Sequence, residues 1–286
     1  MRIVSLLPSA TEIVFALGIG EELVGVSHDC DFPPQARDLP FVTRPRGPGP
    51  AAPGLPWLAP DEAAILDVRP DLVLGAGARE VEGLARRLGP DVAVVRLEPT
   101  SVEGILNSIS TVGAMTEAED AAVDVVEELR ERLQAVEEIV VGRRDHGFAP
   151  PRVAALEWLD PPFAVGRWVP EQVRLAGGWE LLGREAEPPA ATSWDAVREM
   201  DPEVLVLMPA GLHLHQAIRA WADTPRPAGW AELRAVRGGR VFAVDGAAHF
   251  SRPGPRIVDG IEVLAELFDP LAFDGMSPPE SWARVD

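Results

Sequence analysis

The sequence predicts an α/β protein made of two Rossmann-like α/β lobes joined by one long backbone α-helix, with a ligand cleft between the lobes. Three observations predict this fold class. The chain has 286 residues, which suits two domains of roughly 150. Short apolar runs alternate with helical segments, the pattern of parallel sheets covered by helices. A proline, an acidic residue and an apolar run recur together at Pro70 and again 132 residues later at Pro202.

The first lobe begins with a strand, a turn and a helix. The apolar run from Arg2 to Leu7 suits a short buried strand. Ser9 and Glu12 have the spacing of a capping box, so we expect a helix to begin there and to end at Gly18. Further strands are expected at 23–27, 71–76 and 92–97, and helices near 60–68, 80–88 and 102–115.

The longest helical pattern spans 116–141. Its apolar residues recur at spacings of three and four, as on one face of a helix: Ala122, Val126, Leu129, Leu133, Val136 and Val140. A self-pairing coiled coil is the alternative, but three heptads are marginal for one. We therefore predict three parts, an N-terminal lobe at 1–115, a connecting helix at 116–142 and a C-terminal lobe at 143–286.

The second lobe repeats the first. A strand is expected at 152–157, a helix at 171–176, a last strand at 240–244 and a closing helix at 254–268. The segment 61–74 resembles 194–207, because each has an acidic helix start, a proline followed by an acid, and a buried strand. The two lobes therefore look like related copies.

Composition and missing motifs exclude several functions. The net charge of −19 repels phosphate backbones, so neither nucleic acid nor an anionic membrane is expected as a partner. One cysteine permits no internal disulfide. The sequence contains no lysine, hence no Walker motif, and neither a G-x-S-x-G nor an H-E-x-x-H motif. Glu157 and Asp160 leave acid–base chemistry as a remote alternative. We predict a monomeric protein that is no enzyme and requires no cofactor.

The chain as written shows no targeting segment. The apolar run near Met1 ends at Pro8 and is too short for the core of a signal peptide. No stretch approaches the roughly 18 apolar residues of a membrane span. We expect a cytoplasmic protein, or a periplasmic or extracytoplasmic one if Met1 replaces a removed leader.

A small-molecule ligand is expected outside the carboxyl ends of the strands, where open parallel sheets bind their ligands. Aromatic rings and histidines cluster in these segments, which suits a large, partly apolar ligand. The candidate ligand-binding residues are Ser9, His28, Asp29, Trp57, Trp158, Phe163, Trp168, His249, Phe250 and Arg252. A neutral imidazole of His28 or His249 is a possible axial ligand to a metal carried by the bound molecule. No metal site made by the protein alone is predicted.

Several motifs resemble the class III substrate-binding proteins of ABC importers, which include vitamin B12-binding and siderophore-binding members. The segment Leu6-Leu7-Pro8-Ser9-Ala10-Thr11-Glu12 is similar to the start of the vitamin B12-binding proteins. So is the run from Val24 to Pro34, and Pro70-Asp71-Leu72-Val73 and Pro161-Pro162-Phe163 also fit. The chain looks like a leaderless branch of this family, because neither a leader nor a lipid-anchor cysteine is visible.

The resemblance implies a function and a partner. The family holds a corrinoid between its lobes with aromatic residues of the facing loops, which here match Trp57, Trp158, Phe163 and Phe250. Members that serve an importer dock on its membrane subunits through one acidic residue in each lobe. The corresponding positions are Glu62 and Asp195, although both also suit ordinary helix N-termini.

The sequence therefore leaves three candidate functions. The first is non-catalytic binding of a corrinoid, cobalamin or a precursor, as part of an ABC-type uptake system or in a leaderless relative of one. The second is a cytosolic enzyme or carrier that acts on a tetrapyrrole or metal chelate. The third is a siderophore or haem binder on the same fold.

Overall fold

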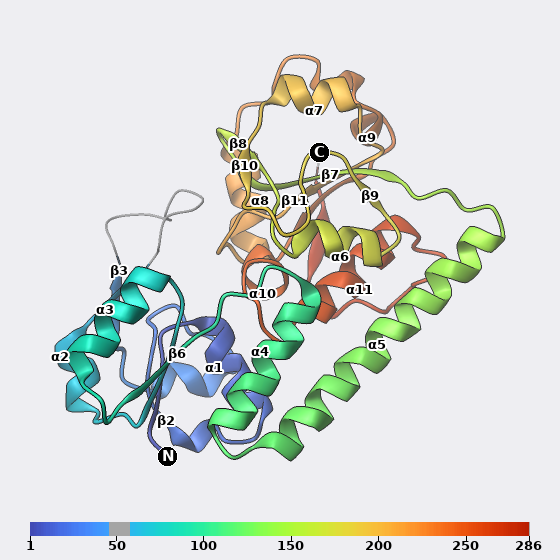
Figure 1. The fold of residues 1–286 in the computed structure, drawn as a ribbon. Coiled ribbons are helices and arrows are strands. Elements are labelled where there is room, and N and C mark those ends of the chain that lie inside the picture. Colours follow the sequence, from blue (N-terminus) through green and yellow to red (C-terminus); the bar gives the residue numbers. More distant parts are fainter. Residues whose placement is uncertain (46–57, 286) are drawn as a thin grey trace. The chain divides into compact units, whose positions relative to one another are not determined.

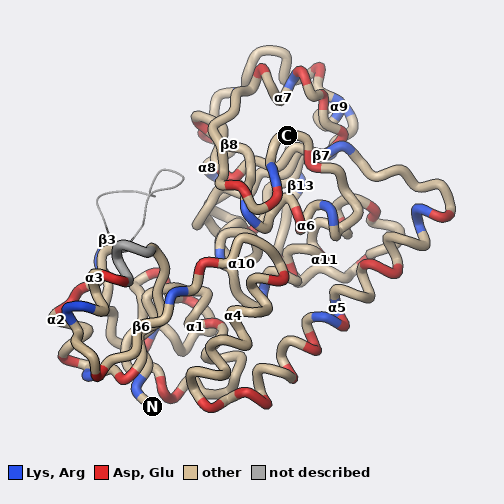
Figure 2. The backbone as a smooth tube through the Cα atoms, in the orientation of Figure 1, with Lys and Arg blue, Asp and Glu red and all other residues tan. Residues whose placement is uncertain are grey.

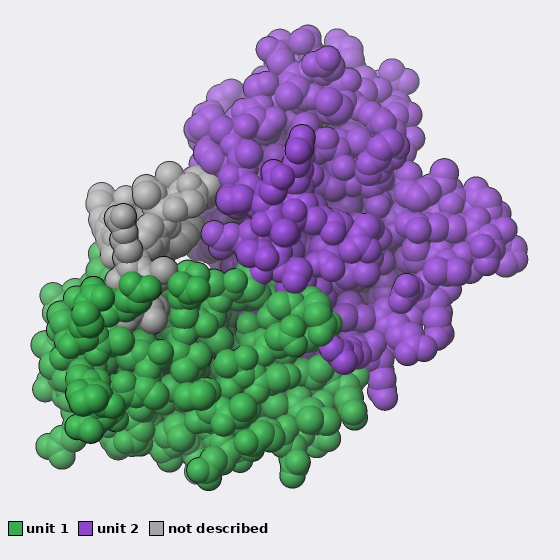
Figure 3. Space-filling view, in the orientation of Figure 1, with its two compact units in different colours: residues 1–99, 103–128 green, residues 100–102, 129–286 purple. Residues whose placement is uncertain are grey.

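The computed structural model describes residues 1–45 and 58–285 (Figure 1). The chain divides into two compact units (Figure 3). Unit 1 comprises 1–99 and 103–128, and unit 2 comprises 100–102 and 129–286. Strands and helices alternate in both, so the predicted mixed α/β fold is confirmed.

Unit 1 contains a four-stranded parallel sheet with the strand order β2-β1-β5-β6. Its strands are β1 (Ile3–Ser5), β2 (Leu23–Val26), β5 (Leu72–Gly75) and β6 (Ala93–Arg96). Each lies inside the apolar run that predicted it. A separate antiparallel pair is formed by β3 (Thr43–Pro45) and β4 (Leu58–Pro60).

The helices of unit 1 follow the strands as an alternating fold requires. They are α1 (Pro8–Ala16), α2 (Glu62–Asp67), α3 (Ala78–Leu88) and α4 (Val102–Met115), with 3-10 turns at Gly20–Glu22 and Pro34–Asp38. Val4 and Val73 of the sheet pack with Val42, Ile65 and Leu84 in a buried core. This core fixes the sheet on which the candidate residues of unit 1 stand.

The capping box predicted at Ser9 and Glu12 is wrong. Helix α1 begins at Pro8, its N-cap is Leu7 with no side-chain cap, and Ser9 and Glu12 lie buried within the helix. The physical reason is Pro8 itself. Proline is favoured in the first helical turn, because its ring fixes a helical φ and the N–H that it lacks would have no partner there.

Helix α5 (Glu119–Asp145) is the longest helix of the described chain, and it begins in unit 1 and ends in unit 2. Leu129 and Val136 are buried on one face, as the sequence periodicity predicts. Acidic residues and arginines are interspersed along the helix (Figure 2). The helix ends in a Schellman motif, in which the amide of Gly147 bonds Arg144 O and that of Phe148 bonds Arg143 O.

Unit 2 contains a mixed seven-stranded sheet with the order β10-β8-β7-β11-β12-β13, and β9 also pairs with β7. The strands β7, β11 and β12 are parallel, whereas β8, β10 and β13 run antiparallel to their neighbours. The bounds are β7 (Arg152–Leu159), β8 (Pro162–Ala164), β9 (Trp179–Glu180), β10 (Ala190–Ala191), β11 (Val204–Leu207), β12 (Val241–Val244) and β13 (Trp282–Arg284).

The helices of unit 2 cover this sheet. They are α6 (Val169–Leu175), α7 (Trp194–Met200), α8 (Leu214–Asp223), α9 (Arg234–Arg237), α10 (Gly246–His249) and α11 (Ile257–Phe268), with a 3-10 turn at Trp230–Glu232. Trp221 is buried in the core, and Trp194 and Trp230 pack against it with ring centroids 5.9 and 4.9 Å away. These three rings are part of the framework of unit 2.

The repeated sequence segments form corresponding hydrogen bonds in both units. In unit 1, Asp71 accepts a hydrogen bond from the Arg2 amide at 2.7 Å, and the Arg2 guanidinium bonds Val68 O. In unit 2, Glu203 accepts from the Arg152 amide at 2.9 Å, and the Arg152 guanidinium bonds Met200 O. In each unit the acid after the proline therefore binds the arginine amide, and the guanidinium of the same arginine binds the end of a helix.

Candidate functional site

One edge of the unit 1 sheet gathers the residues that follow its strands. Because the four strands are parallel, their carboxyl ends meet at this edge, where open α/β sheets bind ligands. His28 and Asp29 follow β2 here, and Gly77 follows β5. The side chains of His28 and Asp29 are 19% and 43% exposed, so both remain accessible.

A network of hydroxyl groups orients His28. Thr43 Oγ1 lies 2.7 Å from His28 Nδ1 and also accepts the His28 amide at 3.0 Å. The Thr43 hydroxyl donates in turn to Ser27 Oγ at 3.3 Å. Ser27 and Thr43 are both buried, so the network fixes the imidazole from the interior. No local sequence pattern points to Thr43, which is 15 residues from His28 in the chain.

Ser9 does not lie on the accessible part of this edge. It is 4% exposed within α1, so the predicted hydrogen bond from its hydroxyl to a ligand does not fit its position. Cys30, also buried, has its sulfur 3.1 Å from Thr11 Oγ1. These side chains support the edge from within.

The unit 2 sheet has an equivalent edge at the ends of β7, β11 and β12. Beyond its parallel partner, β7 continues and folds back as an antiparallel hairpin with β8. Trp158 and Phe163 are directly opposed in this hairpin and both rings are partly exposed. Opposed residues project from the same face, so the hairpin presents an aromatic pair.

Glu157 lies in a β-bulge of the hairpin, between the pairs that Leu156 and Trp158 form with β8. Bulges redirect side chains and are frequent beside binding sites. Burial raises the pKa of the Glu157 carboxyl to about 7, although the nearby positive charge of Arg167 opposes the increase. The hairpin therefore holds a carboxyl group that titrates near neutral pH beside the aromatic pair.

The loops that follow β11 and β12 are fastened to each other. His213 Nδ1 lies 3.0 Å from Asp245 Oδ2, and the Gly211 amide donates to Ser251 Oγ at 3.1 Å. Burial opposes ionisation of Asp245, but hydrogen bonds from His213 and from the Ala248 amide outweigh it, so its pKa lies below the usual value. The sequence patterns do not predict this pair, although both residues follow predicted strands.

Three candidates predicted at the ligand lie in the interior of unit 2. Trp168, Phe250 and His249 are 5%, 2% and 6% exposed. The Trp168 indole donates to Phe250 O at 2.9 Å, and His249 Nε2 lies 3.2 Å from Ser281 Oγ. A ring that covers a ligand, or an imidazole that reaches its metal, requires exposed surface. The roles predicted for these three residues therefore do not fit their burial, and they support the loops instead.

His249 and Phe250 are buried because of the course of the chain after β12. The strand is followed directly by α10, a single helical turn packed against α11, and His249 and Phe250 at the end of this turn are buried. Arg252 follows and stays partly exposed. Trp57 lies outside the described residues.

The two predicted docking acids stand in the first turns of corresponding helices. Glu62 opens α2 and forms an ion pair with Arg87 at 2.8 Å. Asp195 lies in the first turn of α7, has a side chain that is 84% exposed, and pairs with Arg198 at 2.9 Å. Both carboxylates are therefore at the surface of their own unit.

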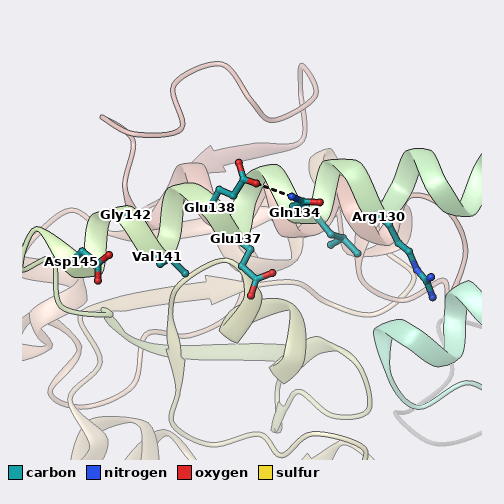
Figure 4. Close-up of a pocket in the computed structure, with 8 residues that line it drawn as sticks. Arg130, Gln134, Glu137, Glu138, Val141, Gly142 and Asp145 are labelled. Carbon is teal, nitrogen blue, oxygen red and sulfur yellow. Dashed lines mark hydrogen bonds between the residues drawn. The ribbon is translucent and has the colours of Figure 1, made fainter.

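Two surface hollows lie elsewhere. One, of about 660 Å³, is lined by α5 residues alone, among them Glu137, Glu138 and Asp145 (Figure 4). The other, of about 700 Å³, includes Trp179, whose strand pairs with the amino end of β7. The first is an open face of one helix on which Gln134 bonds Glu138 at 2.8 Å. Neither hollow lies at the carboxyl ends of the strands.

Comparison with known proteins assigns the family. The model of the family described as "Periplasmic binding protein" matches residues 3–248. The chain belongs to this family. It is a class III substrate-binding protein of the ABC-transporter type, as the sequence motifs predict. Within the described residues of this periplasmic binding protein, no helix is both long enough and apolar enough to cross a bilayer.

Relatives of this periplasmic binding protein cover almost its whole length. It is 27% identical over 268 residues to the vitamin B12-binding protein of Vibrio cholerae. The aligned region covers 91% of this chain and 86% of that protein. It is 26% identical to an uncharacterised ABC transporter substrate-binding lipoprotein of Bacillus subtilis, over 95% of this chain and 81% of that protein.

Solved structures show the same fold. The periplasmic vitamin B12-binding protein BtuF of Vibrio cholerae has a TM-score of 0.74 and 25% identity, over 96% of this chain and 98% of that one. The apo form of the periplasmic haem-binding protein RhuT from Roseiflexus has a TM-score of 0.72 and 25% identity, over 95% and 98%. The family thus consists of proteins that bind small-molecule substrates outside the cytoplasm for membrane transporters.

Proposed function

We propose that this protein binds a corrinoid, cobalamin or a precursor of it, and releases it unchanged. The observation that carries the proposal is the similarity over 268 residues to a vitamin B12-binding protein. The loops at the carboxyl edges of the sheets supply the contacts. Trp158 and Phe163 offer apolar rings to the corrin face, while His28, Asp29 and Arg252 offer polar groups to its amide rim or metal.

The first test is to titrate the purified protein with cyanocobalamin and with cobinamide and to monitor binding by calorimetry and by tryptophan fluorescence. Saturable binding at micromolar affinity or tighter supports a corrinoid binder. Recovery of unchanged ligand after prolonged incubation separates a binding protein from an enzyme or carrier that alters the tetrapyrrole. Absence of binding with either compound would overturn the proposal.

Trp158→Ala tests the aromatic hairpin. Loss of one ring face costs about 1 kcal/mol or more, so the dissociation constant for cobinamide should rise at least fivefold. The matched control is Trp179→Ala, because Trp179 is 60% exposed and lies at the amino end of β7. Equal affinity of the Trp158 variant and the wild type would remove the hairpin from the site.

Haem is the second candidate, favoured by the haem-binding protein of Roseiflexus at 25% identity. A competition titration distinguishes the two ligands. The compound that displaces the other at the lower concentration is the preferred one. A siderophore enters the same competition as a third compound.

An ABC importer is the proposed partner, with Glu62 and Asp195 as its docking acids. Reversing both charges, with Glu62→Arg and Asp195→Arg, should abolish transporter-dependent uptake while leaving corrinoid affinity unchanged. Charge reversal at two other exposed acids, Glu127 and Glu199, is the control. Uptake that survives the first double reversal would show that Glu62 and Asp195 do not dock the transporter.

A further inference from the structure

Histidine binds a metal only through a ring nitrogen that carries no proton, so the tautomer decides whether an accessible imidazole can be a ligand. The chain has five histidines. His249 is buried and its Nε2 lies 3.2 Å from Ser281 Oγ. His213 Nδ1 is paired with Asp245. His28 differs from His249 because its ring is partly exposed, and from His213 because its Nδ1 contacts the buried hydroxyl of Thr43 rather than a carboxylate.

The hydroxyl network around His28 favours one tautomer, as a count of protons shows. Thr43 Oγ1 carries one proton, which it donates to Ser27 Oγ. It therefore has only lone pairs left for its other two contacts, the His28 amide at 3.0 Å and His28 Nδ1 at 2.7 Å. With the Thr43 proton on Ser27, Nδ1 is the protonated nitrogen and donates to Thr43. Nε2 consequently carries the free lone pair.

The side chain of Asp29 leaves this lone pair available. Asp29 Oδ1, at 3.6 Å, is beyond hydrogen-bonding length. Metal-ligating histidines commonly donate their other ring N–H to an oxygen that sets ring orientation and tautomer. Buried Thr43 occupies that position here, and Ser27 supports it from the interior.

We propose that His28 Nε2 is the axial ligand to the metal of the bound tetrapyrrole, and that Thr43 and Ser27 are the positioning residues that preset its tautomer. This inference rests on the proposed function and specifies the contact between the protein and the metal. The step is a ligand exchange. The Nε2 lone pair forms a bond to Co(III), the bound water leaves, and neither the oxidation state nor the number of protons changes.

The tautomer is tested first, in the protein without ligand. Nitrogen-15 correlation spectra of the histidine rings should show the proton of His28 on Nδ1. In Ser27→Ala the Thr43 proton is released and turns to Nδ1, so the population should shift toward the Nε2-H form. Thr43→Ser keeps the hydroxyl and should resemble the wild type. A His28 that is Nε2-H in the wild type would overturn the assignment.

Ligation is tested with two forms of cobinamide. Diaquocobinamide has exchangeable axial water, whereas the cyanides of dicyanocobinamide block both axial positions. Wild-type protein should shift the visible absorption bands of the diaquo form at one equivalent and leave those of the dicyano form unchanged. His28→Ala should abolish the shift, Ser27→Ala should weaken it at least threefold, and Thr43→Ser should retain it. His213→Ala is the histidine control and should also retain it.

The two forms separate this inference from the proposed function. Saturable binding of dicyanocobinamide, followed by tryptophan fluorescence, reports on corrinoid binding alone. Binding of both forms with no band shift would overturn ligation by His28 and leave the proposed function standing. A shift that survives in His28→Ala would do the same. Failure of both forms to bind would overturn the proposed function and the ligation together.

Discussion

At the scale of single residues, Glu157 couples the candidate site to pH. Its pKa is raised by burial from 4.5 to about 7, so between these values the folded state holds a proton that the unfolded state has released. The free energy of unfolding therefore falls as the pH rises from about 4.5 to about 7. Above that range the folded protein carries the full cost of a desolvated carboxylate.

Glu157→Gln should remove this cost. At pH 8 we expect the free energy of unfolding to rise by about 1–3 kcal/mol, because the full pKa difference corresponds to roughly 3 kcal/mol and partial exposure reduces it. At pH 4.5 the variant and the wild type should be equally stable. Urea denaturation at both pH values measures the difference, and the exposed Glu199→Gln serves as the control. Equal stability of wild type and Glu157→Gln at pH 8 would contradict a buried carboxylate.

Individual residues also show which contacts sequence patterns cannot predict. His28 and Trp158 could be placed at strand ends, because buried strands are recognisable from short apolar runs. Thr43 could not be connected to His28, since the contact arises only when the chain returns beside β2. Trp168 is buried where its indole donates a hydrogen bond to Phe250 O, 82 residues away, a contact that no local pattern encodes.

At the scale of elements, α5 is fastened to α11 by a cluster of charges. The Arg132 guanidinium donates to Glu262 Oε1 at 2.9 Å and forms an ion pair with Asp259. The two acidic side chains are 17% exposed or less, so they are largely removed from water. Removing one partner of such a pair leaves an uncompensated charge, which costs more than the pair itself contributes.

Arg132→Met should therefore lower the free energy of unfolding by about 2–4 kcal/mol, measured by chemical denaturation at pH 7. Adding Asp259→Asn and Glu262→Gln to this variant removes the stranded charges and should restore at least half of the loss. Arg130→Met, two residues away on an exposed position, is the control. A triple variant no more stable than Arg132→Met would show that packing, rather than charge, stabilises the contact between α5 and α11.

The same helix shows what periodicity does and does not predict. Its apolar face follows from spacings of three and four, which persist because a helix exposes one side to the core. The end of the helix does not follow from the spacing, since the sequence predicts a helix that ends at 142 whereas the helix continues to Asp145. Gly147, whose φ is +86°, terminates the helix, because glycine readily adopts the left-handed conformation found at helix ends.

At the scale of the whole molecule, the charge of −19 sets up a long-range field that acts on ligands before contact. Acidic positions outnumber basic ones on the described chain (Figure 2). The field extends about 30 Å at 0.01 M salt and about 8 Å at 0.15 M. It repels an anion such as haem, with its two propionates, and acts little on a neutral corrinoid.

Association rates should therefore distinguish the two candidate ligands by their response to salt. Raising the salt from 0.01 to 0.15 M should increase the association rate constant of haem at least threefold, because screening weakens the repulsion. The rate constant of neutral dicyanocobinamide should change by less than a factor of about 1.5. Stopped-flow quenching of the eight tryptophans measures both. A haem rate that falls with salt would mean that arginines at the site, such as Arg252, dominate the local field and would favour an anionic ligand.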